Sequence, residues 1–149
     1  MSEIRATEQV SKKWGWEQVV VNRAEYCGKI LHLNQGGFCS MHAHLRKLED
    51  FFVLSGRVWL ETQQGFWMPD EQYQPQIKAV EGSPIVGRML RPGDVVNIGR
   101  GMLHRFTGVD RDSALMEIST QHFDDDSYRL TESGQLGMDA LKEKISGVV

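Results

Sequence analysis

The stretch Gly36–Gly56, GGFCSMHAHLRKLEDFFVLSG, holds two histidines one residue apart and a glutamate five residues after the second. Side chains on a β-strand alternate between its two faces, so His42 and His44 point to the same side. Glu49 follows a turn predicted over Leu45–Leu48 and opens an apolar run that is typical of a strand. We expect an adjacent antiparallel strand to bring the Glu49 carboxylate beside the two imidazoles.

These side chains form a candidate metal site. Two nitrogen ligands and one oxygen ligand suit Mn, Fe, Co, Ni or Zn and do not select among them. A further histidine, His104, follows an RPGD turn, an apolar run and a glycine-rich turn, which predicts that it starts another strand. From these residues alone, two surface histidines and a solvated glutamate stay open as the alternative.

The remainder of the chain predicts an all-β domain. Glycines divide residues 28 to 120 into short β-rich runs, and short strands separated by turns are typical of an antiparallel sandwich or barrel. Helical spacing occurs in Gln135–Ile145, where Leu136, Leu141 and Ile145 lie near one face. Residues 62–78 are polar, contain two prolines, and predict a long loop or an irregular hairpin tip that serves as a lid or a dimer contact.

Composition excludes several functional classes. The chain has 149 residues with 40% hydrophobic and 25% charged residues, which fits a single globular domain. A formal net charge of -3 gives no electrostatic reason to expect a nucleic acid or an anionic membrane as a partner. No apolar run resembles a signal peptide or a membrane span, so we expect a cytoplasmic protein. The two cysteines, Cys27 and Cys39, are expected to be buried thiols.

The segments Gly36–Gly56 and Gly93–Gly108 resemble the two signature motifs of the cupin superfamily. The first motif, a glycine, five residues, HxH, three or four residues, Glu, six residues and Gly, is matched in full within Gly36–Gly56. The second is matched at Gly93, Gly101 and His104, and differs where proline is usual, at Gly99, and where asparagine is usual, at Gly108. Those differences affect turns and spare the ligand positions.

The resemblance implies an all-β cupin barrel (a double-stranded β-helix, or jelly roll) with short helical segments at the termini. It implies one domain over residues 1–149, with a barrel core at about 17–120 and a C-terminal helical tail at about 124–146. A divalent transition metal held by His42, His44, Glu49 and His104 is implied inside one mouth of the barrel, with no organic cofactor.

The resemblance also implies a homodimer, and strand parity supports it. Glu49, Phe51 and Val53 would face inward. Phe52 and Leu54, together with Cys39 and Met41, would then form an apolar outer face that we expect to be buried between two subunits.

A finer resemblance suggests the chemistry. The segments KKWGWE from Lys12, the central motif, and LMEISTQHFDDDSYR from Leu115 are similar to the cupin domain of type II mannose-6-phosphate isomerases. This likeness implies aldose–ketose isomerisation of a sugar or sugar phosphate, through an enediolate at a three-histidine, one-glutamate metal site. A non-haem iron dioxygenase and a non-catalytic sugar-binding or regulatory cupin stay open as alternatives.

An isomerase needs a Lewis acid, a base that moves a proton between C1 and C2, and groups that position the substrate. Glu117 is the candidate base, and Lys47, between two predicted ligands, is the second candidate catalytic residue. Arg129 and Arg105 are candidates for substrate binding. His32, His122 and the carboxylates of Asp124–Asp126 are expected to be structural or exposed.

Overall fold

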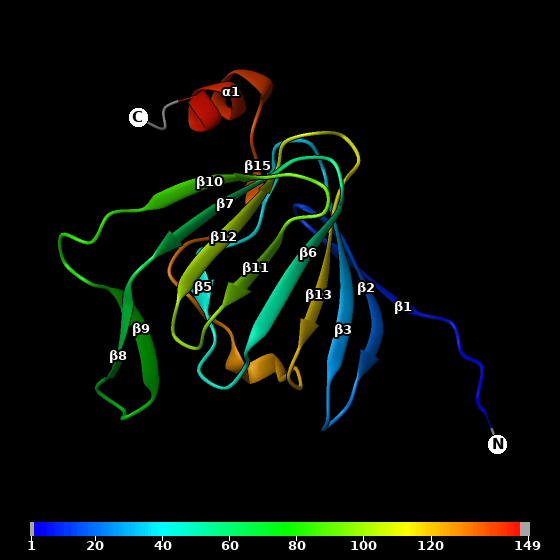
Figure 1. The fold of residues 1–149 in the computed structure, drawn as a ribbon. Coiled ribbons are helices and arrows are strands. Elements are labelled where there is room, and N and C mark those ends of the chain that lie inside the picture. The colour runs from blue at the N-terminus through cyan, green and yellow to red at the C-terminus, as the bar shows by residue number, and fades with distance from the viewer. Residues whose placement is uncertain (1, 147–149) are drawn as a thin grey trace.

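The computed structural model describes residues 2–146, and in them two antiparallel sheets face each other around a common core (Figure 1). The six-stranded sheet has the order β1 (Glu8–Lys12), β2 (Gly15–Asn22), β3 (Cys27–Leu33), β13 (Ser113–Ser119), β6 (Glu49–Ser55) and β11 (Val95–Ile98). The seven-stranded sheet contains β10 (Val86–Leu90), β7 (Val58–Gln63), β12 (Leu103–Gly108), β4 (Gly37–Phe38), β15 (Gly134–Gln135), β5 (His42–Ala43) and β14 (Tyr128–Arg129).

Strand parity determines the core. In β6 the side chains of Glu49, Phe51 and Val53 are buried and point between the sheets, as predicted, whereas Leu54 is exposed on the outer side. The main core cluster takes apolar side chains from both sheets, including Leu115 and Phe106. Burying this apolar area is the main term that stabilises the sandwich, at about 25 cal/mol per Å² removed from water.

One of the two residues assigned with Phe52 and Leu54 to the outer face of the barrel was placed wrongly. Cys39 belongs to the main core cluster, whereas Met41 does face outward but is buried in a second cluster on the outer side of the seven-stranded sheet. The alternation fails because the chain between β4 and β5 is not a regular strand. Both Cys27 and Cys39 are buried free thiols, as expected.

The predicted loop over residues 62–78 is largely a regular hairpin. Strands β8 (Gly65–Pro69) and β9 (Pro75–Ala79) pair in register and project from the body of the protein (Figure 1). Its turn is held by the Asp70 carboxylate, which accepts hydrogen bonds from the backbone N–H groups of Gln72 and Gln74, each at 2.8 Å. Trp67 packs against Tyr128 with 4.7 Å between ring centroids, over the second cluster, so the hairpin covers the outside of the seven-stranded sheet.

The two ends of the chain differ from their predicted limits. The paired strands run from Glu8 to Gln135, which is wider than a core at 17–120. The segment expected to be a helical tail holds a 3-10 turn η1 (Asp124–Asp126), the short strands β14 and β15, and the helix α1 (Met138–Ser146). The short strands form because their backbones complete the pairing of β5 and β4. At the N-terminal end the chain forms strand β1 and not a helix.

The helix α1 is fixed at the top of the sandwich by few contacts (Figure 1). Leu141 is its buried residue, and Lys144 Nζ lies 2.5 Å from Glu61 Oε1 on β7. Within residues 2–146 no helix is long and apolar enough to cross a membrane.

Candidate metal and substrate site

Three histidines converge between the sheets. His42 on β5 is the direct cross-strand partner of His104 on β12, and His44 follows β5. One ring nitrogen from each histidine lies within 4.8 Å of the other two. The antiparallel pairing of β5 with β12 therefore brings together residues that are more than fifty positions apart in the sequence.

Each imidazole is oriented by a backbone carbonyl that accepts a hydrogen bond at Nδ1. The acceptors are Ser40 for His42 at 2.7 Å, Asp126 for His44 at 2.7 Å, and Met102 for His104 at 3.0 Å. A carbonyl oxygen can only accept, so Nδ1 carries the proton in all three rings. The Nε2 lone pairs are left for coordination, which is the arrangement that metal-binding histidines adopt in proteins.

Glu49 approaches these rings from the facing sheet. Its Oε1 lies 3.6 Å from His44 Nε2, and its Oε2 lies 3.4 Å from His104 Nε2. The side chain is only 1% exposed, and within residues 2–146 Oε2 has no hydrogen-bond partner. The prediction that an adjacent antiparallel strand carries Glu49 was wrong, because β5 and β6 belong to different sheets.

The protonation states suit a cation. Burial, helped by the neighbouring imidazoles, lowers the pKa of His42 well below its ordinary value. Burial likewise lowers the pKa of His44 to about 4, so both rings are neutral near pH 7. Burial alone would raise the pKa of Glu49, but His104 and Lys47 outweigh it and hold that pKa below its usual range. A buried carboxylate oxygen without a donor, facing imidazole lone pairs, fits a divalent metal as the missing partner.

A buried lysine connects this cluster to the candidate base. Lys47, 3% exposed, places Nζ 3.0 Å from Glu49 Oε1 and 3.3 Å from Glu117 Oε2. Glu117, on β13, also accepts a hydrogen bond from Ser119 Oγ at 3.1 Å. Burial raises the pKa of Glu117, and the Lys47 charge offsets part of that rise. The two candidate catalytic residues therefore touch each other and lie beside the metal cluster.

His122 extends this chain of contacts and was not predicted to do so. Its Nδ1 accepts from Lys47 Nζ at 3.3 Å, so its Nε2 carries the proton and donates to Asp124 Oδ1 at 3.2 Å. Burial lowers the pKa of His122, with Lys29 and Lys47 acting in the same direction.

Asp126 corrects the expectation that the acidic run is solvated. Its side chain is 1% exposed, and its carboxylate accepts backbone N–H groups from Leu45, Arg46 and Lys47, each at 3.0 Å. Together with the carbonyl that orients His44, these contacts fix the turn between the predicted ligands. A carboxylate that accepts hydrogen bonds from distant backbone N–H groups leaves no signal in the spacing of a sequence.

A cavity of about 640 Å³ opens between the sheets above this cluster. Its lining includes all four predicted ligands, Lys47 and Glu117, together with charged residues of the N-terminal strands and of the C-terminal segment. Arg129, the candidate for substrate binding, and Lys29 are also among its lining residues.

The prediction for Arg105 was wrong. Its guanidinium pairs with Glu61 Oε2, and it stacks 5.8 Å from the ring centroid of Phe38, away from the cavity. The reason is parity, because Arg105 follows inward-facing His104 on β12 and so points to the opposite face.

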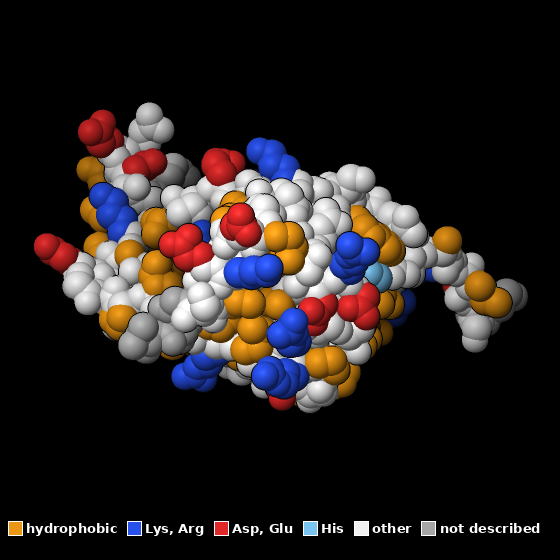
Figure 2. Space-filling model, turned by 90° about the horizontal axis from the view of Figure 1, so that it is seen from above, with side chains coloured by type: hydrophobic (Ala, Val, Ile, Leu, Met, Phe, Trp, Pro, Cys, Tyr) orange, Lys and Arg blue, Asp and Glu red, His pale blue; other side chains and the backbone are white. Residues whose placement is uncertain are grey.

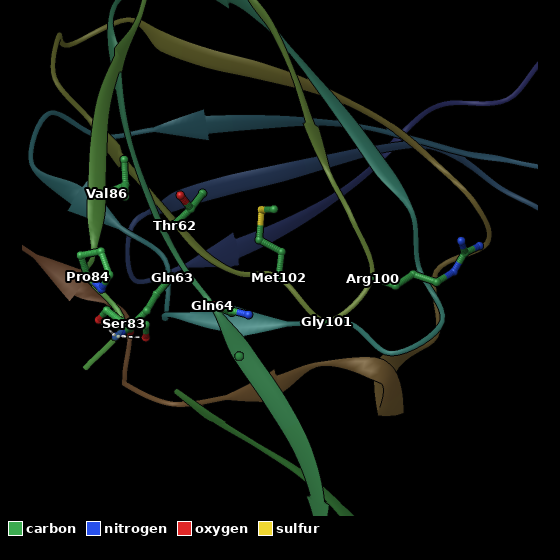
Figure 3. Close-up of a pocket in the computed structure, with 10 residues that line it drawn as sticks. Thr62, Gln63, Gln64, Ser83, Pro84, Val86, Arg100, Gly101 and Met102 are labelled. Atoms are coloured by element: carbon green, nitrogen blue, oxygen red, sulfur yellow. Dashed lines mark hydrogen bonds between the residues drawn. The ribbon is translucent and has the colours of Figure 1, made fainter. Parts of the chain in front are cut away.

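A second hollow of about 420 Å³ lies between β7, β8 and the turn before β12 (Figure 3). Gln63 bridges its wall by donating to the Ser83 carbonyl at 3.1 Å, and Arg100 points away from the other lining residues. Its lining contains no histidine or carboxylate, so the chemistry belongs to the inner cavity.

Solved structures of other proteins share this fold. Similar chains include the capsular polysaccharide assembling protein CapF from Staphylococcus aureus (17% identity, TM-score 0.65, covering 84% of this chain and 34% of that one). They also include KdgF from Halomonas sp. (15% identity, TM-score 0.60, covering 79% of this chain and 89% of that one). A third is oxalate decarboxylase from Bacillus subtilis (14% identity, TM-score 0.60, covering 83% of this chain and 30% of that one). The chain thus spans about a third of the CapF chain, and at these identities the likeness shows the fold alone. A comparison with curated proteins found no match.

The fold defines the protein as an all-β jelly-roll cupin in which three histidines are placed to hold a metal ion. A family model for D-lyxose isomerase matches residues 12–136, most of the chain. The chain belongs to the D-lyxose isomerase family. The cupin resemblance found in the sequence is confirmed, and the matching branch of sugar isomerases is this family and not the type II mannose-6-phosphate isomerases.

Proposed function

We propose that the protein is a metal-dependent aldose–ketose isomerase that acts on D-lyxose or a closely related aldose. The family supports the reaction class. The observation that carries the proposal is the continuous buried cluster in which Glu49, facing the three imidazoles, is joined through Lys47 to Glu117.

The residues divide into holding and reacting groups. His42, His44, His104 and Glu49 would hold the metal, which when bound supplies a Lewis acid for the carbonyl and the neighbouring hydroxyl oxygen. Glu117 takes the proton from C2 of the aldose and returns it to C1, while the hydroxyl proton on O2 passes to O1, and the two transfers together yield the 2-ketose. Within residues 2–146 both contacts of Glu117 are made by Oε2, so Oε1 is the oxygen that is available to the substrate.

Lys47 is the positioning residue for this transfer. Burial opposes its charge, but Glu117 and Glu49 outweigh that effect and raise the pKa of Lys47, so it stays an ammonium ion. Its two ion pairs keep both carboxylates in place on neighbouring strands of the six-stranded sheet. The raised pKa of Glu117 makes its carboxylate a stronger base than a solvated one.

The test is isomerisation of D-lyxose under anaerobic conditions by protein of measured metal content. Glu117→Gln should lower kcat by about 100-fold or more while metal content and melting temperature stay near the wild-type values. Glu81→Gln, at an exposed position remote from the cavity lining, is the matched control. Full activity in Glu117→Gln would remove that residue from the mechanism.

The same assays separate the alternatives. Oxygen consumption by the iron-loaded protein without anaerobic conversion of an aldose would indicate a dioxygenase. Sugar binding without turnover in either assay would indicate a binding module.

We also propose that two subunits associate through the outer face of the six-stranded sheet. Trp16 stacks on His32 there with 3.7 Å between ring centroids. Leu54 and Ile118 are 39% and 56% exposed on the same face. By contrast, the face seen from above in Figure 2 carries Lys, Arg, Asp and Glu side chains mixed with small apolar areas, with no extended basic surface.

A further inference from the structure

His122 is a partly buried imidazole whose two nitrogens are both used inside the protein. It follows β13, and its side chain is 21% exposed. Its Nδ1 accepts from Lys47 Nζ at 3.3 Å, and its Nε2 donates to Asp124 Oδ1 at 3.2 Å. A neutral imidazole has one donor and one acceptor, so these two contacts leave neither for a substrate. Any part that His122 plays in the reaction therefore passes through one of these two neighbours.

Lys47 is the more important of the two neighbours. The Asp124 carboxylate is fully exposed, and a contact to a solvated carboxylate is worth little. Lys47 is 3% exposed, so its three N–H donors need acceptors inside the protein. Glu49 and Glu117 supply two of these acceptors, and His122 supplies the third. The imidazole thus completes the hydrogen bonding of a buried ammonium ion.

The fold fixes His122 beside the turn that carries Lys47. At the end of β2, the Asn22 amide donates to the His122 carbonyl at 3.0 Å, and its Oδ1 accepts the His122 backbone N–H at 2.9 Å. Two residues earlier, the Thr120 backbone N–H donates to the Leu48 carbonyl, and Thr120 Oγ1 accepts the Leu48 N–H, each at 3.1 Å. The position of the imidazole is therefore set by contacts to two separate parts of the chain.

The third acceptor decides where the ammonium ion lies. Lys47 Nζ is 3.0 Å from Glu49 Oε1 and 3.3 Å from Glu117 Oε2. An ammonium ion that loses a neutral acceptor turns toward the carboxylates that remain. A closer positive charge makes a carboxylate a weaker base. Without the imidazole of His122, Lys47 would pair more tightly with Glu117, which would then take a proton from carbon less readily.

We propose that His122 is a positioning residue of the isomerisation, which holds the Lys47 ammonium ion off the candidate base Glu117, and that Asn22 fixes His122 in turn. The inference rests on the proposed isomerase function, which it deepens by adding two residues that act without touching the substrate.

The first experiment is His122→Phe, which keeps a ring and removes both nitrogens. The kcat for D-lyxose should fall about 10- to 100-fold, as for the loss of a hydrogen bond to a charged group. KM should stay within about threefold, because His122 offers the bound substrate no donor or acceptor. Metal content should match wild type, since the carbonyls that orient the three histidine ligands are unchanged. A rise in KM with unchanged kcat would assign His122 to substrate binding and overturn the proposal.

His122→Asn separates positioning from packing. Asn Oδ1 is bonded to Cγ, as Nδ1 of histidine is, so the amide can accept from Lys47 although it fills much less space. Its kcat should stay within about threefold of wild type. If His122 only filled space, the phenylalanine variant would be active and the asparagine variant impaired. That order of activities would overturn the proposal.

Asn22→Ala tests the support of the imidazole. It removes both hydrogen bonds to the His122 backbone, and kcat should fall about 3- to 10-fold, as for the loss of an uncharged hydrogen bond. Glu25→Ala, at an exposed position of the same hairpin turn and outside the cavity lining, is the matched control and should keep the wild-type kcat. Equal activity of the two variants would overturn the role of Asn22.

The histidine tautomer tests the contact without turnover. In NMR spectra of protein labelled in its histidine nitrogens, the signals of His122 are those that disappear in His122→Phe. An Nε2–H tautomer near neutral pH supports the contact with Lys47 even if no aldose is converted, and failed conversion then counts against the isomerase function alone. An Nδ1–H tautomer would overturn the proposal, because Nδ1 could not accept from an ammonium ion.

Discussion

Replacing Asp126 by alanine tests how the site is supported. The substitution removes the carboxylate that accepts the backbone N–H groups of Leu45, Arg46 and Lys47, each at 3.0 Å. Two of these N–H groups lie in exposed residues and can turn to water, whereas that of Lys47 is buried. With about 1 kcal/mol for each of the first two and about 2 kcal/mol for the third, unfolding becomes easier by about 4 kcal/mol.

For a domain of this size, that change lowers the melting temperature by about 8 to 16 °C. It should also weaken metal binding by about 10- to 100-fold, because the same turn carries His44 and leads into Glu49. Calorimetry and competition with a chelator measure the two effects. Asp125→Ala is the matched control, since its carboxylate is 83% exposed and, within residues 2–146, forms an ion pair with Arg46 alone. A melting temperature within about 2 °C of wild type for Asp126→Ala would refute the reasoning.

Three other predictions follow from contacts outside the cavity. Gly108→Ala should reduce the yield of folded protein, since an added Cβ would overlap the Asn34 carbonyl oxygen. In Gly99→Ala the added Cβ meets open space, so this variant should keep the wild-type melting temperature, and melting curves of the two variants test the difference. Hydrogen bonds from Arg57 lower the pKa of Asp110, so the Arg57–Asp110 ion pair stabilises the fold above pH 3.8, and this stabilisation is lost as the pH falls further. In acid titrations, the difference in free energy of unfolding between wild type and Asp110→Asn should therefore shrink below pH 3.8. Ile118→Lys should convert a dimer to monomers in light scattering, and an unchanged mass would place the interface elsewhere.

The two signature motifs were sufficient to predict the fold and the cluster. Their spacing fixes which residues face inward, and in β6 that parity held from Glu49 through Val53. It failed at Cys39, where the chain between β4 and β5 leaves regular strand geometry and alternation no longer applies. Arg105 was misplaced although its adjacency to His104 already indicated the opposite face.

The residues that were missed depend on tertiary contacts. Asp126 acts through backbone groups about eighty positions away, and no local pattern separates it from its exposed neighbours Asp124 and Asp125. Lys29 was detectable, because it shares the inward parity of Leu31 and Leu33 in the strand CGKILHL. A lysine at an inward position of an apolar strand indicates a cavity that requires its charge.

The central claim is that four side chains from two facing sheets hold one divalent cation. Crystals of the purified protein, measured at the absorption edge of the metal that elemental analysis identifies, test it directly. We expect a single anomalous peak about 2.0 to 2.2 Å from Nε2 of His42, His44 and His104 and from a carboxylate oxygen of Glu49. A peak bound elsewhere, or none between these side chains in metal-replete protein, would contradict the account.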